Sequence, residues 1–119
     1  EKLAEADRYY YSPIATGRRF TKGLLNDDIQ QVYNTYSQQV QQQLSLEQFK
    51  EQEQLQVIRQ KINDLAKQAT YQIELRNQVE GTARVAVLFS SNSNSTLGLA
   101  LDLRKNDYGW KIANKVDIY

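Results

Sequence analysis

The sequence predicts an α+β domain in which N-terminal helices pack on one face of a curved, antiparallel, four-stranded meander. In the first half of the chain, apolar residues recur at spacings of three and four, which is typical of helices with one buried stripe. From about residue 69 the spacing changes to two, which is typical of strands with one buried face. Short links rich in turn residues separate the later segments, so consecutive strands are expected to pair antiparallel. Helices followed by strands favour a layer of helices on a single sheet.

The composition restricts both the architecture and the chemistry. A length of 119 residues with 40% hydrophobic residues fits one folded domain, expected over residues 13–119 after a lead-in over residues 1–12. The absence of cysteine and histidine excludes disulfides, thiolate nucleophiles, zinc sites of the usual kind and histidine-based triads. A net charge of +1 argues against binding of a nucleic-acid backbone. No apolar run is long enough to span a bilayer.

Two helices are predicted before residue 41. Ser12 followed by Pro13 indicates a helix start, and this first helix is expected to end near Asn26. Asn26 or Asp27 is then expected to cap a second helix, with the Asp27-Asp28 pair at its positive end. Because capping explains this acidic pair, no metal or other cofactor is expected. The second helix is expected to run on through a single apolar stripe formed by Ile29, Val32, Tyr33, Tyr36 and Val40.

The clearest local signal is the segment Leu44-Ser45-Leu46-Glu47-Gln48-Phe49. Ser45 and Gln48 have the spacing of a capping box, in which each side chain bonds the backbone of the other residue. Leu44 and Phe49 have the spacing of the hydrophobic staple that often accompanies such a box. This pattern predicts a helix that starts after Ser45. The three/four spacing of the later apolar residues predicts that it persists, either straight or with a kink, to about Lys67: Leu55, Ile58, Ile62, Leu65 and Ala69.

Four strands are predicted in the second half of the chain. Period-two alternation marks residues 71–76, 83–89, 97–104 and 110–118, and turn-rich links join them at 77–81, 90–95 and 106–109. Trp110 is expected on the core face, near Leu99 and Leu101.

Three stretches carry a resemblance to a known fold family. They are Phe20-Thr21-Lys22-Gly23-Leu24-Leu25-Asn26-Asp27-Asp28 with the following Val32-Tyr33, then residues 44–49, and finally Tyr108-Gly109-Trp110-Lys111-Ile112. With this order of elements, the chain resembles the nuclear-transport-factor-two-like, or cystatin-like, superfamily, in particular small uncharacterised domains of bacterial secreted and membrane-anchored proteins. The resemblance implies a cone between the helices and a curved sheet. The stretch 52–68 departs from the family pattern, because it is longer and more helical than in a typical member.

The resemblance also implies a setting outside the cytoplasm, periplasmic or on the cell surface. The chain begins at Glu1 and contains no methionine, so it is expected to be a processed or excised segment. The resemblance implies that a membrane anchor would lie upstream of residue 1. The lack of cysteine fits such a setting. Asn94-Ser95-Thr96 matches the glycosylation sequon, which matters only if the source secretes through an endoplasmic reticulum.

Two sets of residues are candidates for a functional site. The first is aromatic and is expected to point into the cone, where it would either stack on a small apolar ligand or fill the core: Tyr33, Tyr36, Tyr71 and Trp110. Catalytic members of the superfamily commonly place a histidine in the cone. This chain has none, so no catalytic residue is assigned.

The second set lies on the opposite face of the predicted sheet. It combines small or apolar positions with basic residues around them: Ala86, Leu88, Ala100, Ala113, Arg84 and Arg104. An apolar centre with a charged rim is typical of a protein interface, although an ordinary solvated sheet face gives the same pattern. The Tyr9-Tyr10-Tyr11 run is a further candidate contact, or else a packed lead-in to the first helix.

The function expected from these observations is therefore protein contact without catalysis. The partner would be another protein, or a second copy of the chain in a homodimer, held through the sheet face or the tyrosine-rich N-terminus. The alternative is a small-ligand-binding or weakly enzymatic cone domain that uses the aromatic set.

Overall fold

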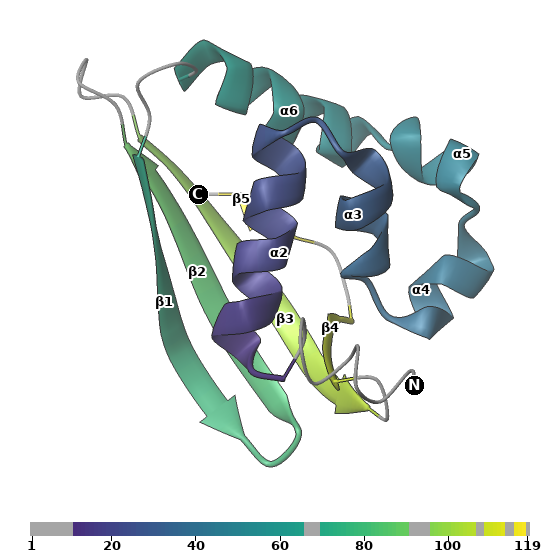
Figure 1. Cartoon of the computed structure of the whole chain (residues 1–119), viewed down its shortest axis with the longest axis vertical. Coiled ribbons are helices and arrows are strands. Elements are labelled where there is room, and N and C mark those ends of the chain that lie inside the picture. Colours follow the sequence, from purple (N-terminus) through teal and green to yellow (C-terminus); the bar gives the residue numbers. More distant parts are fainter. Residues whose placement is uncertain (1–10, 66–69, 91–95, 107–108, 114–115, 119) are drawn as a thin grey trace.

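The computed structural model describes residues 11–65, 70–90, 96–106, 109–113 and 116–118. The helices among them are α2 (Pro13–Leu25), α3 (Ile29–Asn34), α4 (Gln38–Gln43), α5 (Leu46–Lys50) and α6 (Glu53–Leu65). The strands are β1 (Thr70–Val79), β2 (Thr82–Ser90), β3 (Thr96–Asn106), β4 (Gly109–Ile112) and β5 (Asp117–Ile118). The predicted α+β class, with helices before strands, is confirmed (Figure 1).

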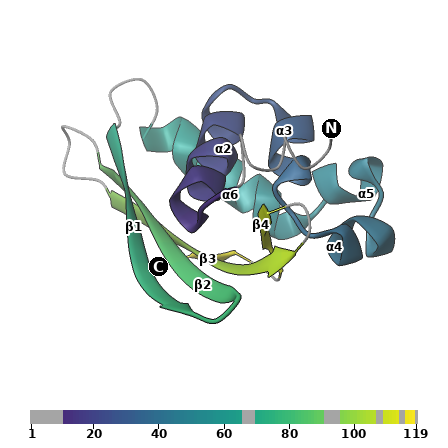
Figure 2. The same cartoon turned by 60° about the horizontal axis from the view of Figure 1, so that its bottom comes forward.

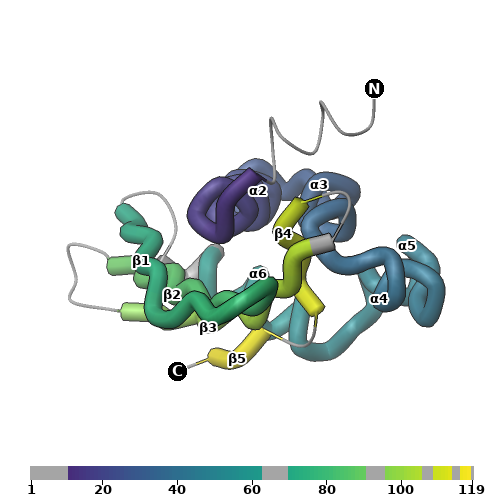
Figure 3. The backbone as a smooth tube through the Cα atoms, turned by 90° about the horizontal axis from the view of Figure 1, so that it is seen from below, coloured from purple at the N-terminus to yellow at the C-terminus, as the bar shows by residue number. Residues whose placement is uncertain are grey.

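The strands form one open antiparallel sheet in the order β1-β2-β3-β4, and β5 also pairs with β3. Ala86 lies opposite Ala100 in the β2–β3 pair, and Leu103 lies opposite Ile112 in the β3–β4 pair. The helices lie together on one side of the sheet, which curves beneath α2 (Figures 1 and 2). The tube in Figure 3 shows the same two layers from below.

The core fills the space between these layers. Its largest fully buried side chains come from the helices and from the inward-facing positions of the strands: Phe20, Val32, Phe49 and Ile58, then Val85, Val87, Phe89, Leu99, Leu101, Leu103 and Ile112. Trp110 is buried as predicted. Its cross-strand partner is Lys105, however, because β4 pairs with the far end of β3 rather than with the part that holds Leu99 and Leu101.

The turn between α2 and α3 depends on both aspartates of the acidic pair. Asp27 adopts a left-handed conformation (φ 56°), which ends α2. Asp28, rather than Asn26 or Asp27, is the N-cap of α3, and its side chain accepts a hydrogen bond from the N–H of Gln31. A Cβ atom at Gly23 would lie 2.8 Å from Val32 Cγ2, so only glycine lets the two helices approach this closely.

The single helix predicted over residues 29–40 is wrong. The structure has two helices, α3 and α4, separated by Thr35, Tyr36 and Ser37. The Thr35 hydroxyl donates to the carbonyl of Val32 at 2.6 Å, and the Ser37 side chain caps α4 by accepting from the N–H of Val40. Both side chains compete with the helical backbone hydrogen bonds, which is the physical reason for the break.

The long helix predicted from Ser45 to Lys67 is also divided, into α5 and α6, and residues 66–69 lie outside the described chain. Phe49 and Leu55 are six positions apart and both are buried. In a continuous helix they would lie about 120° apart around the axis, so the two could not face the core equally well. The break at Glu51 and Gln52 allows both side chains to be buried.

The strand predicted over residues 110–118 is likewise two strands. Ile112 of β4 lies opposite Leu103, and Asp117 of β5 lies opposite Ala100, so the intervening chain is longer than the β3 segment it faces. Val116 within this extra length is fully buried. The longer chain between Ile112 and Asp117 thus places the Val116 side chain in the core and interrupts the pairing with β3.

Hydrogen bonds from the helical layer hold β4 on the side away from β3. The N–H of Ile112 donates to the carbonyl of Thr35, and the N–H of Ser37 donates to the carbonyl of Ile112, both at 2.8 Å. The hydroxyl of Thr16, on α2, donates to the carbonyl of Trp110 at 2.7 Å. β4 is therefore bonded to two separate helical segments as well as to β3.

The predicted capping box is confirmed and gives the first test. The Ser45 hydroxyl accepts from the N–H of Gln48, and the Gln48 side chain accepts from the N–H of Ser45. Replacing Ser45 with Ala should lower the free energy of unfolding by about 1 kcal/mol, the usual effect of losing an N-cap side chain. Urea denaturation followed by circular dichroism measures this. An unchanged midpoint would mean that the cap does not contribute to stability.

The second test concerns the bond between Thr16 and β4. Thr16 is fully buried, and Thr16→Val removes the hydroxyl while keeping the shape of the side chain. We expect a loss of about 1–2 kcal/mol, because the buried Trp110 carbonyl loses a hydrogen bond that water cannot replace. Thr16→Ser, which keeps the donor, is the matched control. Equal losses in the two variants would contradict a role for the hydroxyl.

Candidate functional site

The four aromatic residues predicted to line a cone all belong to the hydrophobic core or pack against it. Tyr33 and Tyr36 both pack against Phe49, with ring centroids 5.2 and 5.0 Å from its ring. Tyr71 packs against Phe89 of β2, at 6.0 Å. Trp110 is buried at the β4 end of the sheet. These positions are those of side chains that fill a core.

The hydroxyl groups of Tyr33 and Tyr36 differ in their partners. The Tyr33 hydroxyl lies 2.5 Å from the carbonyl of Leu44, which satisfies it. For the Tyr36 hydroxyl, no hydrogen-bond partner is found among the described residues, although the side chain is only 8% exposed. Burial raises the pKa of Tyr36 above its usual value, so the group is neutral and remains a potential donor.

Tyr36 lines a groove of about 680 Å³ in the described structure. Val40, Leu44 and Phe49 supply apolar lining, and Arg104 and Lys105 contribute two cations from the end of β3. The remaining lining is mostly glutamine, with one serine and one alanine: Ser37, Gln38, Gln39, Gln43, Gln52, Gln54 and Ala113. Sequence reasoning did not identify this groove. Its signal was the density of glutamines between residues 38 and 54.

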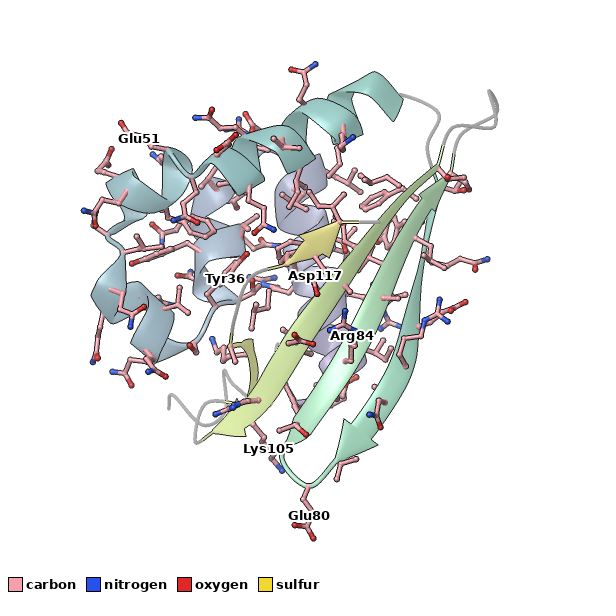
Figure 4. All side chains as sticks on the ribbon, turned by 180° about the vertical axis from the view of Figure 1, so that it is seen from behind. Tyr36, Glu51, Glu80, Arg84, Lys105 and Asp117 are labelled. Carbon is pink, nitrogen blue, oxygen red and sulfur yellow. The ribbon has the colours of Figure 1, made fainter. Side chains whose placement is uncertain are left out.

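The outer face of the sheet carries the second predicted set. No described helix lies on this face, which is turned toward the viewer in Figure 4. Ala86 and Ala100 lie opposite each other and are only 1% and 3% exposed. Next to them, Leu88 lies opposite Gly98. The side chains at the centre of the face are therefore short or absent, and neighbouring side chains cover the two alanines.

Arg84 connects three strands across this face. It lies 2.6 Å from Asp102 of β3 and 3.0 Å from Asp117 of β5 (Figure 4). The hydrogen bonds to Asp117 and then to Asp102 raise the pKa of Arg84. Because these groups are well exposed, each pair contributes no more than about 1 kcal/mol to stability. Their main effect is to fix the orientation of the guanidinium group.

Three residues of the predicted interface line a shallow hollow of about 300 Å³. They are Arg84, Arg104 and Ala113, and Asn77, Thr82 and Asp102 complete its polar lining. Ala86, Leu88 and Ala100 do not line this hollow. The structure thus divides the predicted set into three residues that line a polar hollow and three small or apolar residues outside it.

Lys111 belongs to the attachment of β4 rather than to the open face. Its amine donates to the carbonyl of Asn34, at the end of α3, at 2.7 Å. Burial lowers the pKa of Lys111 to about 8, because the charged form is less well solvated there.

Other candidates are outside the described residues or are not supported by them. Tyr9, Tyr10 and Asn94 lie in stretches that the structure does not describe, whereas Tyr11 is described and is 61% exposed. Within the described ranges, acidic residues do not gather in groups of three or more that would suit a metal ion. None of the described helices has the length and apolar character needed to cross a membrane.

Comparison with known proteins yields no match: no family model, no curated protein and no solved structure is similar to this chain.

Proposed function

We propose that this domain acts without catalysis, by protein contact through the outer face of its sheet. The observation that carries the proposal is that no described helix covers the outer face, where charged side chains surround the small residues Ala86, Gly98 and Ala100. Antiparallel sheets often leave one face to water, and such a face usually carries long polar side chains. Here a central pair of alanines lies beside charged groups, which resembles the centre and rim of an interface.

The charged groups beside these small residues favour association for a further reason. Arg84 is already held by Asp102 and Asp117, so its side chain loses little conformational freedom when a partner approaches. Arg104 is exposed and adds a cation at the adjoining hollow. A partner with an apolar surface and a carboxylate placed near Arg104 would match this arrangement.

The fold-family resemblance and the location belong to the same proposal. We infer that the curved sheet and its helices form a cone of the nuclear-transport-factor-two-like kind, filled by aromatic side chains rather than open. We further propose that the domain works outside the cytoplasm and is held there by an anchor upstream of residue 1. Fractionation of cells that produce the full-length protein tests the location.

Ala100→Arg tests the contact through the sheet face. Ala100 points away from the core, so the added side chain can reach solvent and the fold should survive. In a closed interface the same charge would be desolvated without a partner, and association should weaken at least about tenfold. A photo-crosslinking residue at Leu88 reports the association in cells, and sedimentation velocity reports self-association of the purified protein.

The matched control is Gln56→Arg, which places the same charge on the exposed side of α6. Normal crosslinking in this control, together with its loss in Ala100→Arg, would support contact through the face. Equal crosslinking in both variants would overturn it. An unfolded Ala100→Arg protein would show that Ala100 belongs to the core.

Binding of a small ligand is the second candidate function, favoured by one observation. Tyr36 presents a hydroxyl without a described partner, and it lines a groove whose volume is within the usual range for ligand sites. Arg104 and Lys105 at the same groove favour an anionic ligand. The aromatic set first predicted for this role contributes only Tyr36 to the groove.

Thermal shift with a panel of small carboxylates and phosphate esters tests this second candidate. A compound that raises the melting temperature of the wild type should do so less in Tyr36→Phe, which lacks only the hydroxyl. Tyr33→Phe is the control, because that hydroxyl is already bonded to Leu44 and does not line the groove. Equal shifts in all three proteins would exclude Tyr36 as a ligand contact.

A further inference from the structure

β1 forms one edge of the sheet, and that edge is open. β1 pairs only with β2, and no described residue pairs with its other side. Figures 1 and 2 show β1 at the margin of the molecule, with no described element beyond it. It is a ten-residue strand that contains neither proline nor lysine, two residues that commonly protect sheet edges. An edge of this length offers a row of backbone donors and acceptors to another strand.

The same strand exposes large apolar side chains. Leu75 is 44% exposed and Val79 is 60% exposed. Three other large hydrophobic residues are well exposed in the described part of the chain, and they lie on other segments: Tyr11 at 61%, Leu25 at 44% and Val57 at 38%. Among the described strands, β1 alone carries such exposed apolar residues, and it also forms an open edge of the sheet.

The charges on β1 are arranged symmetrically about Leu75. Glu74 and Arg76 flank it, and their side chains meet at 2.9 Å within the strand. If a second copy of the strand lies antiparallel with Leu75 opposite Leu75, each Glu74 lies opposite an Arg76 of the other copy. Opposite charges on facing positions of an antiparallel pair stabilise the pairing. The Glu-Leu-Arg sequence is thus complementary to itself in this one register.

From these observations we propose that two copies of this chain pair through β1, antiparallel, about a two-fold axis at Leu75. The pairing continues the sheet from one molecule into the other and buries both Leu75 side chains. It also places the outer faces of the two sheets side by side. The interface uses an edge that is distinct from the outer face around Ala86 and Ala100, so it extends the proposed function and does not depend on it.

A bulge in β1 limits how far this pairing extends. The register of β1 on β2 shifts between Leu75 and Asn77, which leaves Arg76 without a partner on β2. Bulges at an edge strengthen the twist and often discourage pairing. Two copies related by a two-fold axis carry the same bulge at equal distances from that axis, so both strands bend alike. The pairing is therefore centred on Leu75 with its two flanking charges.

A single introduced cysteine tests the register directly, because the natural chain has none. In the proposed pairing the two Leu75 Cα atoms lie roughly 4.5–5.5 Å apart, a separation that a disulfide can bridge. Leu75→Cys should therefore form a covalent dimer on mild oxidation. Leu25→Cys is the matched control, since Leu25 is also 44% exposed but lies at the end of α2. We expect Leu75→Cys to link at least about tenfold faster.

Charge exchange tests the complementarity without any crosslink. Glu74→Arg places two arginines opposite each other on both sides of the axis and should raise the dimer dissociation constant about tenfold. Arg76→Glu should do the same with carboxylates. The double variant Glu74→Arg/Arg76→Glu restores opposite charges and should recover the dimer. Sedimentation equilibrium measures all four proteins, and circular dichroism checks that each one folds.

The outcomes separate this proposal from contact through the face. A dimer weakened by each single charge reversal and recovered by the double variant supports pairing through β1. Equal linking rates at positions 75 and 25, or a wild type that stays monomeric at millimolar concentration, would overturn it. A dimer that Ala100→Arg abolishes and Glu74→Arg leaves intact would also overturn it, while supporting the face. A dimer lost only on charge reversal at β1 leaves the face free for another partner.

Discussion

The attachment of β4 to the helical layer is the constraint on which the rest of the arrangement depends. β4 has only four residues, too few to form a stable element on its pairing with β3 alone. Its second side is bonded to the link between α3 and α4, and Thr16 of α2 donates to the Trp110 carbonyl. These hydrogen bonds join the helices, which lie in the N-terminal half of the chain, to a strand near its C-terminus. They also require the α3–α4 link to leave the helix at Tyr36, which brings this side chain to the groove.

The sequence predicted the fold correctly where residues close together in the chain determine the local structure. The capping box at Ser45 and Gln48 needs only four residues, and the alternation in β2 and β3 follows directly from a sheet with one buried face. The errors arose where side-chain hydrogen bonds, burial or a distant segment overrode a regular spacing. The stripe from Ile29 to Val40 has the spacing of one helix, but Thr35 and Ser37 bond the backbone locally, and Ile112 bonds the backbone on both sides of Tyr36. Similarly, the burial of Val116 lengthens the link between β4 and β5, which alternation alone cannot indicate.

The sequence predicted which face of a strand each candidate residue occupies, but it did not predict which candidate residues lie together in one site. Faces of strands follow from period two, so the alanines of the outer face could be assigned from the sequence. Which inward aromatic residues share a cavity depends on packing. Phe49 packs against both Tyr33 and Tyr36, and of these two tyrosines only Tyr36 lines the groove. The groove beside Tyr36 was missed because it joins α4 and α5 to the end of β3, segments more than fifty residues apart in sequence.

The open face and the open edge of the sheet have a common origin. All described helices precede the strands and pack on the same side, so none remains to cover the other face or to flank β1. A meander without crossover helices always leaves two edges, and here the attachment to the α3–α4 link occupies one of them at β4. The uncovered face and the open edge therefore both follow from the topology of the sheet. The residues on each surface determine which partner it can bind. Around Ala86 and Ala100 the face carries short side chains beside charged ones, whereas the edge carries charges in self-complementary order about Leu75. The two surfaces consequently suit different partners. The face suits a different protein whose side chains protrude toward it, and the edge suits a strand identical to β1.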